Sequence, residues 1–137
     1  MRLLARTLLS ILLAASGSAS AQSAPSPETE TTGERFPAAG HVYRVDFGGG
    51  NAFDIAFDAS RPEMTFTRLQ APDAGARETI RFTHRKLRDG LYLVYWQEAD
   101  RTTVVHVEDF ANGVIYTNIT RPDGTFFNGR SRLTLVK

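Results

Sequence analysis

From His41 to the C-terminus, apolar and polar residues alternate with a period of two, the pattern of strands that bury one face. In 41–47, Tyr43, Val45 and Phe47 fall on one face together with His41. Gly- and Pro-containing turn signals separate the alternating segments. The predicted strands are 41–47, 52–58, 63–69 and 78–87, then three strands within 91–118, and a last strand from about 125 to 136.

This pattern predicts an all-β domain, because no helical run interrupts the alternation after residue 40. Short sequential hairpins predict an antiparallel meander, closed as a barrel or folded as a sandwich. We favour an eight-stranded up-and-down barrel, because closure removes exposed strand edges. Eight strands enclose a space that side chains fill or that holds one small ligand.

The first 40 residues lack the alternation. Arg2 and Arg6 precede an apolar run that ends in Ala19-Ser20-Ala21, which predicts a secretory signal peptide over residues 1–21. Residues 22–40 are rich in Pro, Ser, Thr and Glu, with Phe36 as the one large apolar residue, and predict a flexible leader. The barrel domain is then 41–137, in a periplasmic or secreted protein with no stable membrane insertion after cleavage.

Charge and composition exclude several classes of partner and site. Without the two signal-peptide arginines, Lys+Arg falls from 16 to 14 against 15 Asp+Glu, so no basic face is implied and nucleic acid is not an expected partner. The absence of cysteine excludes disulfides, thiolate catalysis and thiolate metal sites. Three histidines without a ligand-type spacing predict no metal site, and no cofactor is expected.

Glu98 and Trp96 are the first candidates for chemistry. Strand alternation places Glu98 on one face with Tyr92 and Trp96. If that face is the interior, Glu98 is a carboxyl with a raised pKa near the barrel mouth, suited to proton transfer or ligand binding. Otherwise it ends a strand in solvent. Trp96 is either a core plug or a flat wall for a planar ligand.

Turn geometry decides which other polar residues join them. A two-residue turn at Asp100-Arg101 pairs Trp96 with Val105 and points His106 away from the Trp96 face, whereas a slip of one residue reverses this. A two-residue loop between Ala111 and Val114 pairs Asp109 with Tyr116. Asp109, Tyr116 and Asn118 then join the Trp96 face, either as an internal hydrogen-bond network or as a ligand site.

The segment YLVYWQEADRTTVVHVEDFANGVIYTNITRPDGTF (92–126) resembles the MoaF-like proteins, which are calycin-like β-barrels with lipocalin-type topology. Its Trp-x-Glu at 96–98 is also similar to the phenolic acid decarboxylases, which share the barrel. That resemblance implies an acid/base role for Glu98. The decarboxylases carry two tyrosines two residues apart on the first strand, where this chain has His41 and Tyr43, and their essential arginine has no clear match here.

Three functions follow as hypotheses. The first is a non-enzymatic barrel, monomeric or dimeric, that binds a small apolar or aromatic molecule. The second is a lyase with Glu98 as acid/base and Tyr43 as hydrogen-bond donor. The third is a filled barrel that serves as a structural or protein-interaction domain. The predicted ligand-binding residues are Tyr43, Phe53, Phe57, Phe82, Tyr92, Trp96, Glu98, Tyr116 and Asn118.

Overall fold

The computed structural model describes residues 35–137, which form nine β-strands. The strands are β1 (Val42–Asp46), β2 (Ala52–Phe57), β3 (Glu63–Arg68), β4 (Arg77–Arg81), β5 (Thr83–Arg88), β6 (Leu91–Gln97), β7 (Thr103–Asp109), β8 (Val114–Thr120) and β9 (Phe126–Leu135). The predicted signal peptide lies outside the described residues.

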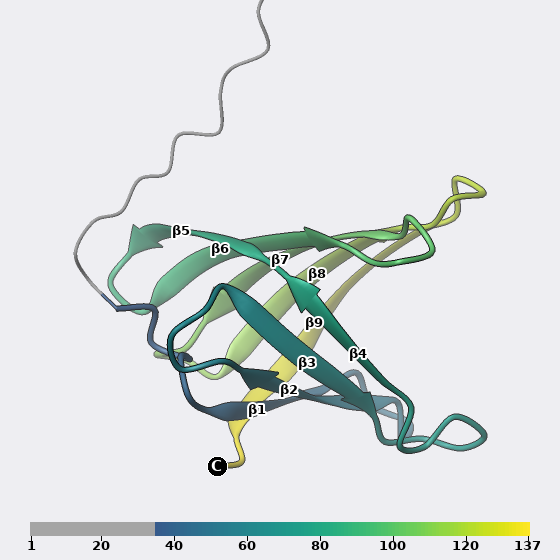
Figure 1. Ribbon diagram of the computed structural model, residues 1–137, viewed down its shortest axis with the longest axis horizontal. Coiled ribbons are helices and arrows are strands. Elements are labelled where there is room, and N and C mark those ends of the chain that lie inside the picture. Colours follow the sequence, from purple (N-terminus) through teal and green to yellow (C-terminus); the bar gives the residue numbers. More distant parts are fainter. Residues whose placement is uncertain (1–34) are drawn as a thin grey trace, which may run out of the picture.

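The nine strands form one curled antiparallel sheet in the order β4-β3-β2-β1-β9-β8-β7-β6-β5. Figure 1 shows β1–β4 as one wall and β5–β8 as the other, with β9 passing between them. The all-β antiparallel barrel predicted from the alternation is therefore confirmed, and the barrel is nearly closed.

The strand count differs from the predicted eight because the segment 78–87 is two strands. The chain leaves β4 at Phe82, whose amide donates to the Pro62 carbonyl at 3.0 Å, and enters β5 on the other wall. β4 pairs only with β3 and β5 only with β6, so this bend is the seam of the barrel. Alternation continues through the bend, which is why sequence periodicity alone did not reveal it.

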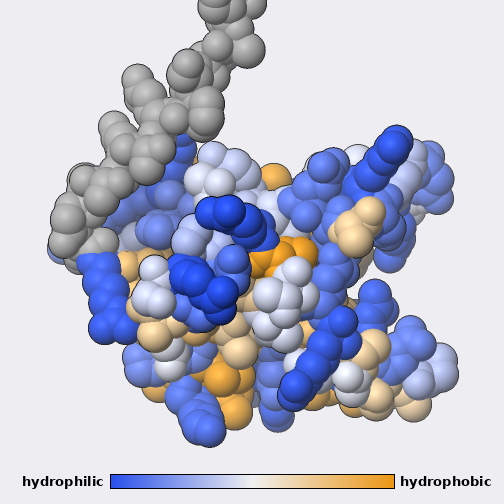
Figure 2. All heavy atoms as spheres, viewed as in Figure 1, coloured by the Kyte–Doolittle hydropathy of each residue, from blue (hydrophilic) through white to orange (hydrophobic). Residues whose placement is uncertain are grey.

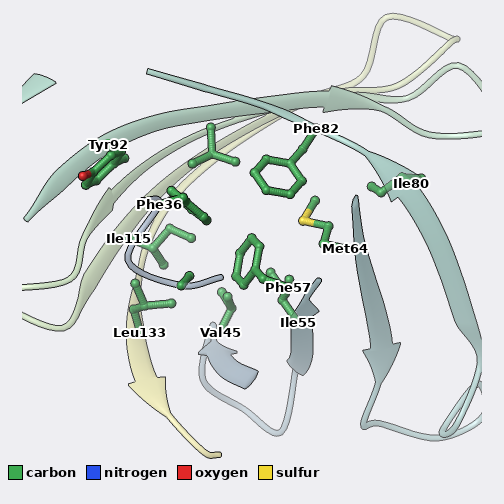
Figure 3. Close-up of a cluster of buried hydrophobic side chains, with 12 residues drawn as sticks. Phe36, Val45, Ile55, Phe57, Met64, Ile80, Phe82, Tyr92, Ile115 and Leu133 are labelled. Atoms are coloured by element: carbon green, nitrogen blue, oxygen red, sulfur yellow. The ribbon is translucent and has the colours of Figure 1, made fainter. Parts of the chain in front are cut away.

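The core gathers at one end of the barrel, around Phe36 (Figure 3). Phe36 is 5% exposed, and its ring lies 4.6–5.7 Å, between centroids, from five other rings. These belong to Phe57, Phe82, His84, Tyr92 and Phe110. The prediction of a flexible leader up to residue 40 is thus wrong for its last residues, since Phe36 and Ala38 are buried in the barrel. One large apolar side chain was enough to anchor the segment.

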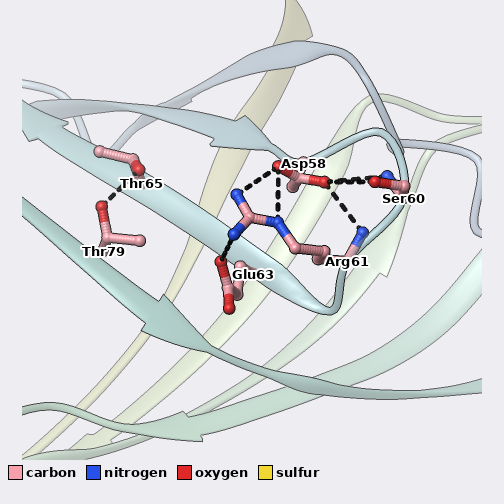
Figure 4. A network of polar contacts seen from close by, with 6 residues as sticks. All are labelled: Asp58, Ser60, Arg61, Glu63, Thr65 and Thr79. Carbon is pink, nitrogen blue, oxygen red and sulfur yellow. Dashed lines mark hydrogen bonds and ion pairs between the residues drawn. The ribbon is translucent and has the colours of Figure 1, made fainter.

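The outer surface is held by local polar contacts rather than by burial. At the β2–β3 turn, Asp58 accepts hydrogen bonds from Ser60 and Arg61, and Arg61 also pairs with Glu63 at 3.1 Å (Figure 4). Asp58 is a turn residue of the type that binds its own following backbone. These contacts fix the β2–β3 turn. The opposite ends of β2 and β3 lie at the open end of the barrel.

Candidate functional site

The end of the barrel opposite Phe36 is hollow. A pocket of about 290 Å³ opens there, lined by side chains from β1, β2, β3, β6, β7 and β8, together with the adjoining turns and Phe127 of β9. Its aromatic residues are Phe47, Phe53, Phe66, Trp96 and Phe127. Figure 2 shows hydrophobic residues, in orange, where the surface is hollowed between the two walls of the barrel. The barrel is therefore filled in one half and open in the other.

Trp96 and Glu98 lie together on the pocket wall, as their alternation on β6 predicts. Glu98 is partly buried, and this burial raises the pKa of its carboxyl, with the nearby charges of Glu78 and Asp100 acting in the same direction. The Trp96 indole and Arg68 act in the opposite direction. The indole N–H is buried close to the Glu98 carboxyl, but it makes no hydrogen bond of good geometry within the described residues. Glu98 forms no ion pair within residues 35–137.

His106 also lines the pocket, against the prediction made from a two-residue turn. The β6–β7 loop has three residues, Ala99 to Arg101: the Glu98 amide donates to the Thr102 carbonyl at 2.8 Å, and Arg101 adopts φ 75°. A left-handed residue of this kind is typical of three-residue hairpin loops. The extra residue pairs Trp96 with Val104 and turns His106 inward.

His106 forms a buried pair with Glu108, which sequence reasoning missed. The imidazole Nδ1 lies 3.2 Å from Glu108 Oε1, and the two residues are 4% and 1% exposed. The Trp96 ring meets the His106 ring edge-on at 4.7 Å between centroids. Glu108 Oε2 has no hydrogen-bond partner in the described part of the chain. The signal that could have found the pair is its i, i+2 spacing on one strand face.

Two further hydroxyls extend this polar strip across the sheet. Thr117 lies opposite His106 on β8, and Ser131 lies opposite Ile115 on β9. Both are buried, and neither Oγ has a hydrogen-bond partner among the described residues. Buried polar groups are normally paired with protein or with ordered water. The inner face of β7, β8 and β9 therefore carries buried hydroxyls without a protein partner in the described residues, outside the pocket lining itself.

Tyr116 and Asn118, in contrast, do not line the pocket. The β7–β8 loop spans the four residues 110–113, so Asp109 pairs with Val114 rather than with Tyr116. Tyr116, which is 47% exposed, and Asn118 pair with Val107 and Val105 on the outer face, where Asn118 accepts a hydrogen bond from Asn128 at 2.7 Å. Asp109 faces the same way and pairs with Arg88. The predicted inner polar cluster of these residues is wrong, because the extra residue in the β6–β7 loop turns Asp109 and its face of β7 outward, and the β7–β8 pairing keeps Tyr116 and Asn118 on that face.

The remaining predicted residues divide between the two halves. Phe53 lines the pocket, but Phe57, Phe82 and Tyr92 belong to the aromatic cluster around Phe36. Tyr43 is also outside the pocket lining and packs against Phe110 at 5.2 Å between ring centroids. Burial raises the pKa of Tyr43, and the Glu108 charge adds to this. The structure therefore does not bring Tyr43 and Glu98 to one site.

Arg68, Asp100 and Arg121 supply charge at the mouth of the pocket. Arg68 lies over the Phe53 ring, with Cζ 5.7 Å from the centroid, and Arg121 helps hold the pKa of Asp100 below its ordinary value after the hydrogen bonds from Thr102. Within residues 35–137, no three His, Asp or Glu side chains are grouped to hold a metal ion, and no helix is long and apolar enough to cross a membrane.

A larger depression, of about 640 Å³, lies elsewhere, between the β1–β2 and β7–β8 turns along β9. It contains neither Trp96, Glu98 nor His106. We place the candidate site in the smaller pocket, because partly buried ionisable groups and aromatic walls converge there.

Comparison with known proteins agrees with this fold. A family model of MoaF-like proteins matches residues 39–134. A crystal structure from Burkholderia vietnamiensis, described as a "putative beta-lactamase", is similar with a TM-score of 0.69 and 33% sequence identity, covering 75% of this chain and 99% of that chain. No curated protein matches. The resemblance of the sequence to the MoaF-like proteins is confirmed.

Proposed function

The chain belongs to the MoaF-like family, and we propose that it binds one small apolar or aromatic molecule in the open half of its barrel. The observation that carries this proposal is the division of the interior: Phe36 and its neighbours fill one half, and aromatic side chains line the pocket in the other. A barrel with a purely structural role has no need of an open, aromatic half.

The size of the pocket limits the ligand. Small-molecule sites commonly measure about 300–1,000 Å³, and an apolar cavity of about 150 Å³ holds benzene. At about 290 Å³, the pocket suits a molecule of one or two rings. Trp96 would form a flat wall against it, and the Trp96 N–H and the Glu98 carboxyl would fix its orientation.

Binding is favoured over the lyase hypothesis by the position of Tyr43. A proton donor must lie within hydrogen-bond reach of the reacting group, and Tyr43 packs at the filled end instead of lining the pocket with Glu98. The name of the Burkholderia vietnamiensis protein suggests hydrolysis, but a nucleophilic serine needs a base in hydrogen-bond contact. Ser131, the buried serine of the described interior, makes no side-chain hydrogen bond.

The proposal is tested by a thermal-shift screen of the purified protein combined with fluorescence of Trp96, the only tryptophan. We expect a one- or two-ring compound that raises Tm and changes Trp96 emission. Phe66→Ala should weaken that compound by about tenfold or more, because it removes one aromatic wall. Tyr116→Ala, on the outer face, should leave the affinity unchanged. A broad library without any Tm shift would refute the proposal.

We also propose that the barrel works in the periplasm or outside the cell. The support is the N-terminal sequence, with a basic start, an apolar run and Ala19-Ser20-Ala21. Mass spectrometry of protein from fractionated cells should find a mature N-terminus at Gln22 in the exported fraction. Recovery of the uncleaved chain in the cytoplasm would contradict this.

A further inference from the structure

The aromatic residues of the pocket form a connected set of rings. Phe66 and Phe53 lie 6.3 Å apart between centroids, Phe53 and Phe47 6.1 Å, and Phe47 and Phe127 5.7 Å, each pair close to perpendicular. Trp96 belongs to the same lining. The face of an aromatic ring carries partial negative charge, and several rings around one space attract a cation.

One of these rings already binds a cation. The Arg68 guanidinium lies over Phe53, with Cζ 5.7 Å from the ring centroid. Arg68 is exposed, and its ion pair with Asp73 is long, at 3.8 Å. The protein thus shows on its own side chains that this wall accepts a positive group.

Two arginines and two carboxyls line the pocket, and the arginines have further carboxylates beside them, whereas Glu98 has only the more distant charge of Arg68. Arg68 has Asp73 as a partner, and Arg121 lies close enough to Asp100 and Asp123 to lower the pKa of both, after their hydrogen bonds to Thr102 and Thr125. Glu98 has no ion pair within the described residues, although it is partly buried on the pocket wall. Behind the pocket, Glu108 adds a second buried carboxyl with one unpartnered oxygen.

We propose that the ligand is an organic cation, an ammonium group on an apolar body of about one ring, held between the aromatic walls and the Glu98 carboxylate. This inference rests on the proposed binding function and names its ligand class. The ammonium supplies the ion pair that Glu98 lacks, and the apolar body replaces water against Phe47, Phe66 and Trp96.

The test compares three probes of similar shape and different charge: 2-phenylethylammonium, 2-phenylethanol and phenylacetate. Their affinities are measured by calorimetry and Trp96 emission on the full protein. We expect the cation to bind about tenfold or more tightly than the neutral alcohol, and the anion to bind weakest. Equal binding of cation and alcohol would overturn the cation inference and leave the proposed function standing. Tightest binding of phenylacetate would also overturn it and would assign the arginines as the recognition groups.

Failure of all three probes, when other library compounds bind, likewise overturns the cation inference alone. If nothing in the library binds, the proposed function itself fails.

Two substitutions sharpen the test. Glu98→Gln should remove most of the preference for the cation over the alcohol, whereas Asp89→Asn, which deletes an exposed carboxylate paired with Lys86 and outside the lining, should keep it. Arg68→Met should strengthen cation binding several-fold, because it frees the face of Phe53 and removes a like charge. Weaker cation binding in Arg68→Met, with Tm unchanged, would contradict the assignment.

Discussion

Phe36 should be one of the largest single contributors to stability, although it lies in a segment whose composition predicts disorder. Phe36→Ala removes a ring that is 5% exposed and surrounded by five other rings. Truncating a core phenylalanine to alanine leaves a cavity and lowers the free energy of unfolding by about 3–5 kcal/mol. For a domain of about 100 residues, each kcal/mol lowers Tm by roughly 4–8 °C, so we expect a fall of roughly 12–40 °C.

The assay is urea unfolding of the purified protein, with thermal unfolding alongside. Phe126→Ala is the matched control, because Phe126 is 62% exposed and its truncation should change the free energy of unfolding by less than about 0.5 kcal/mol. Benzene should restore part of the stability of Phe36→Ala by entering the cavity. A loss below about 1 kcal/mol for Phe36→Ala would falsify the reasoning that this side chain seals the barrel.

Four other predictions concern single residues of the barrel. Glu108→Ala should cost about 3–5 kcal/mol in urea unfolding, because it breaks a buried pair and leaves His106 without its partner; a cost under about 1 kcal/mol would argue against the pair. The pKa of Glu98 is raised, so the folded protein binds its proton more tightly than the unfolded chain does, and stability falls as pH rises from the ordinary carboxyl pKa through the raised one. Glu98→Gln, beside Glu78, Asp100 and Arg68, should therefore raise Tm at pH 7 and leave it unchanged near pH 3, and a Tm gain at both pH values would contradict this. Gly129→Ala should change the free energy of unfolding little, because the new Cβ would meet only the end of the Phe127 ring, at 2.8 Å, but it should shift that ring and change ligand affinity. Gly113→Ala should lower the free energy of unfolding by more than about 1 kcal/mol, because φ is 64° and the new Cβ would meet the Leu133 carbonyl at 3.0 Å.

Alternation was enough to define the sheet and much of its interior. The inward positions of Val45, Ile55 and Phe57 follow from period two alone, because each strand has one face toward the core. The same argument placed Trp96 and Glu98 on one face, and the structure shows that this face lines the pocket, where burial raises the pKa of Glu98. Within a strand, sequence spacing and spatial direction are locked together.

The sequence does not fix in this way which face a residue occupies on the strand that follows a turn. One extra residue in the loop before β7 brought His106 into the pocket, and it also turned Asp109, and with it Tyr116 and Asn118 on β8, to the outside. A change of one residue in loop length reverses the facing of every side chain on the next strand. Loop length in turn depends on local conformations, such as the left-handed Arg101, that the sequence does not reveal.

By itself, the sequence determined that this protein is an all-β antiparallel domain and that Trp96 and Glu98 share one strand face, because those features depend on residues close together in the chain. Closure of the sheet decided that this face lines the interior. The tertiary structure decided which half of the barrel is open. Phe36 fills one end only because β2, β5 and β6, together with the Phe82 and Phe110 corners, meet there, and that meeting sets the position of the pocket. It also placed Glu108 behind His106, with a carboxylate oxygen still unpaired.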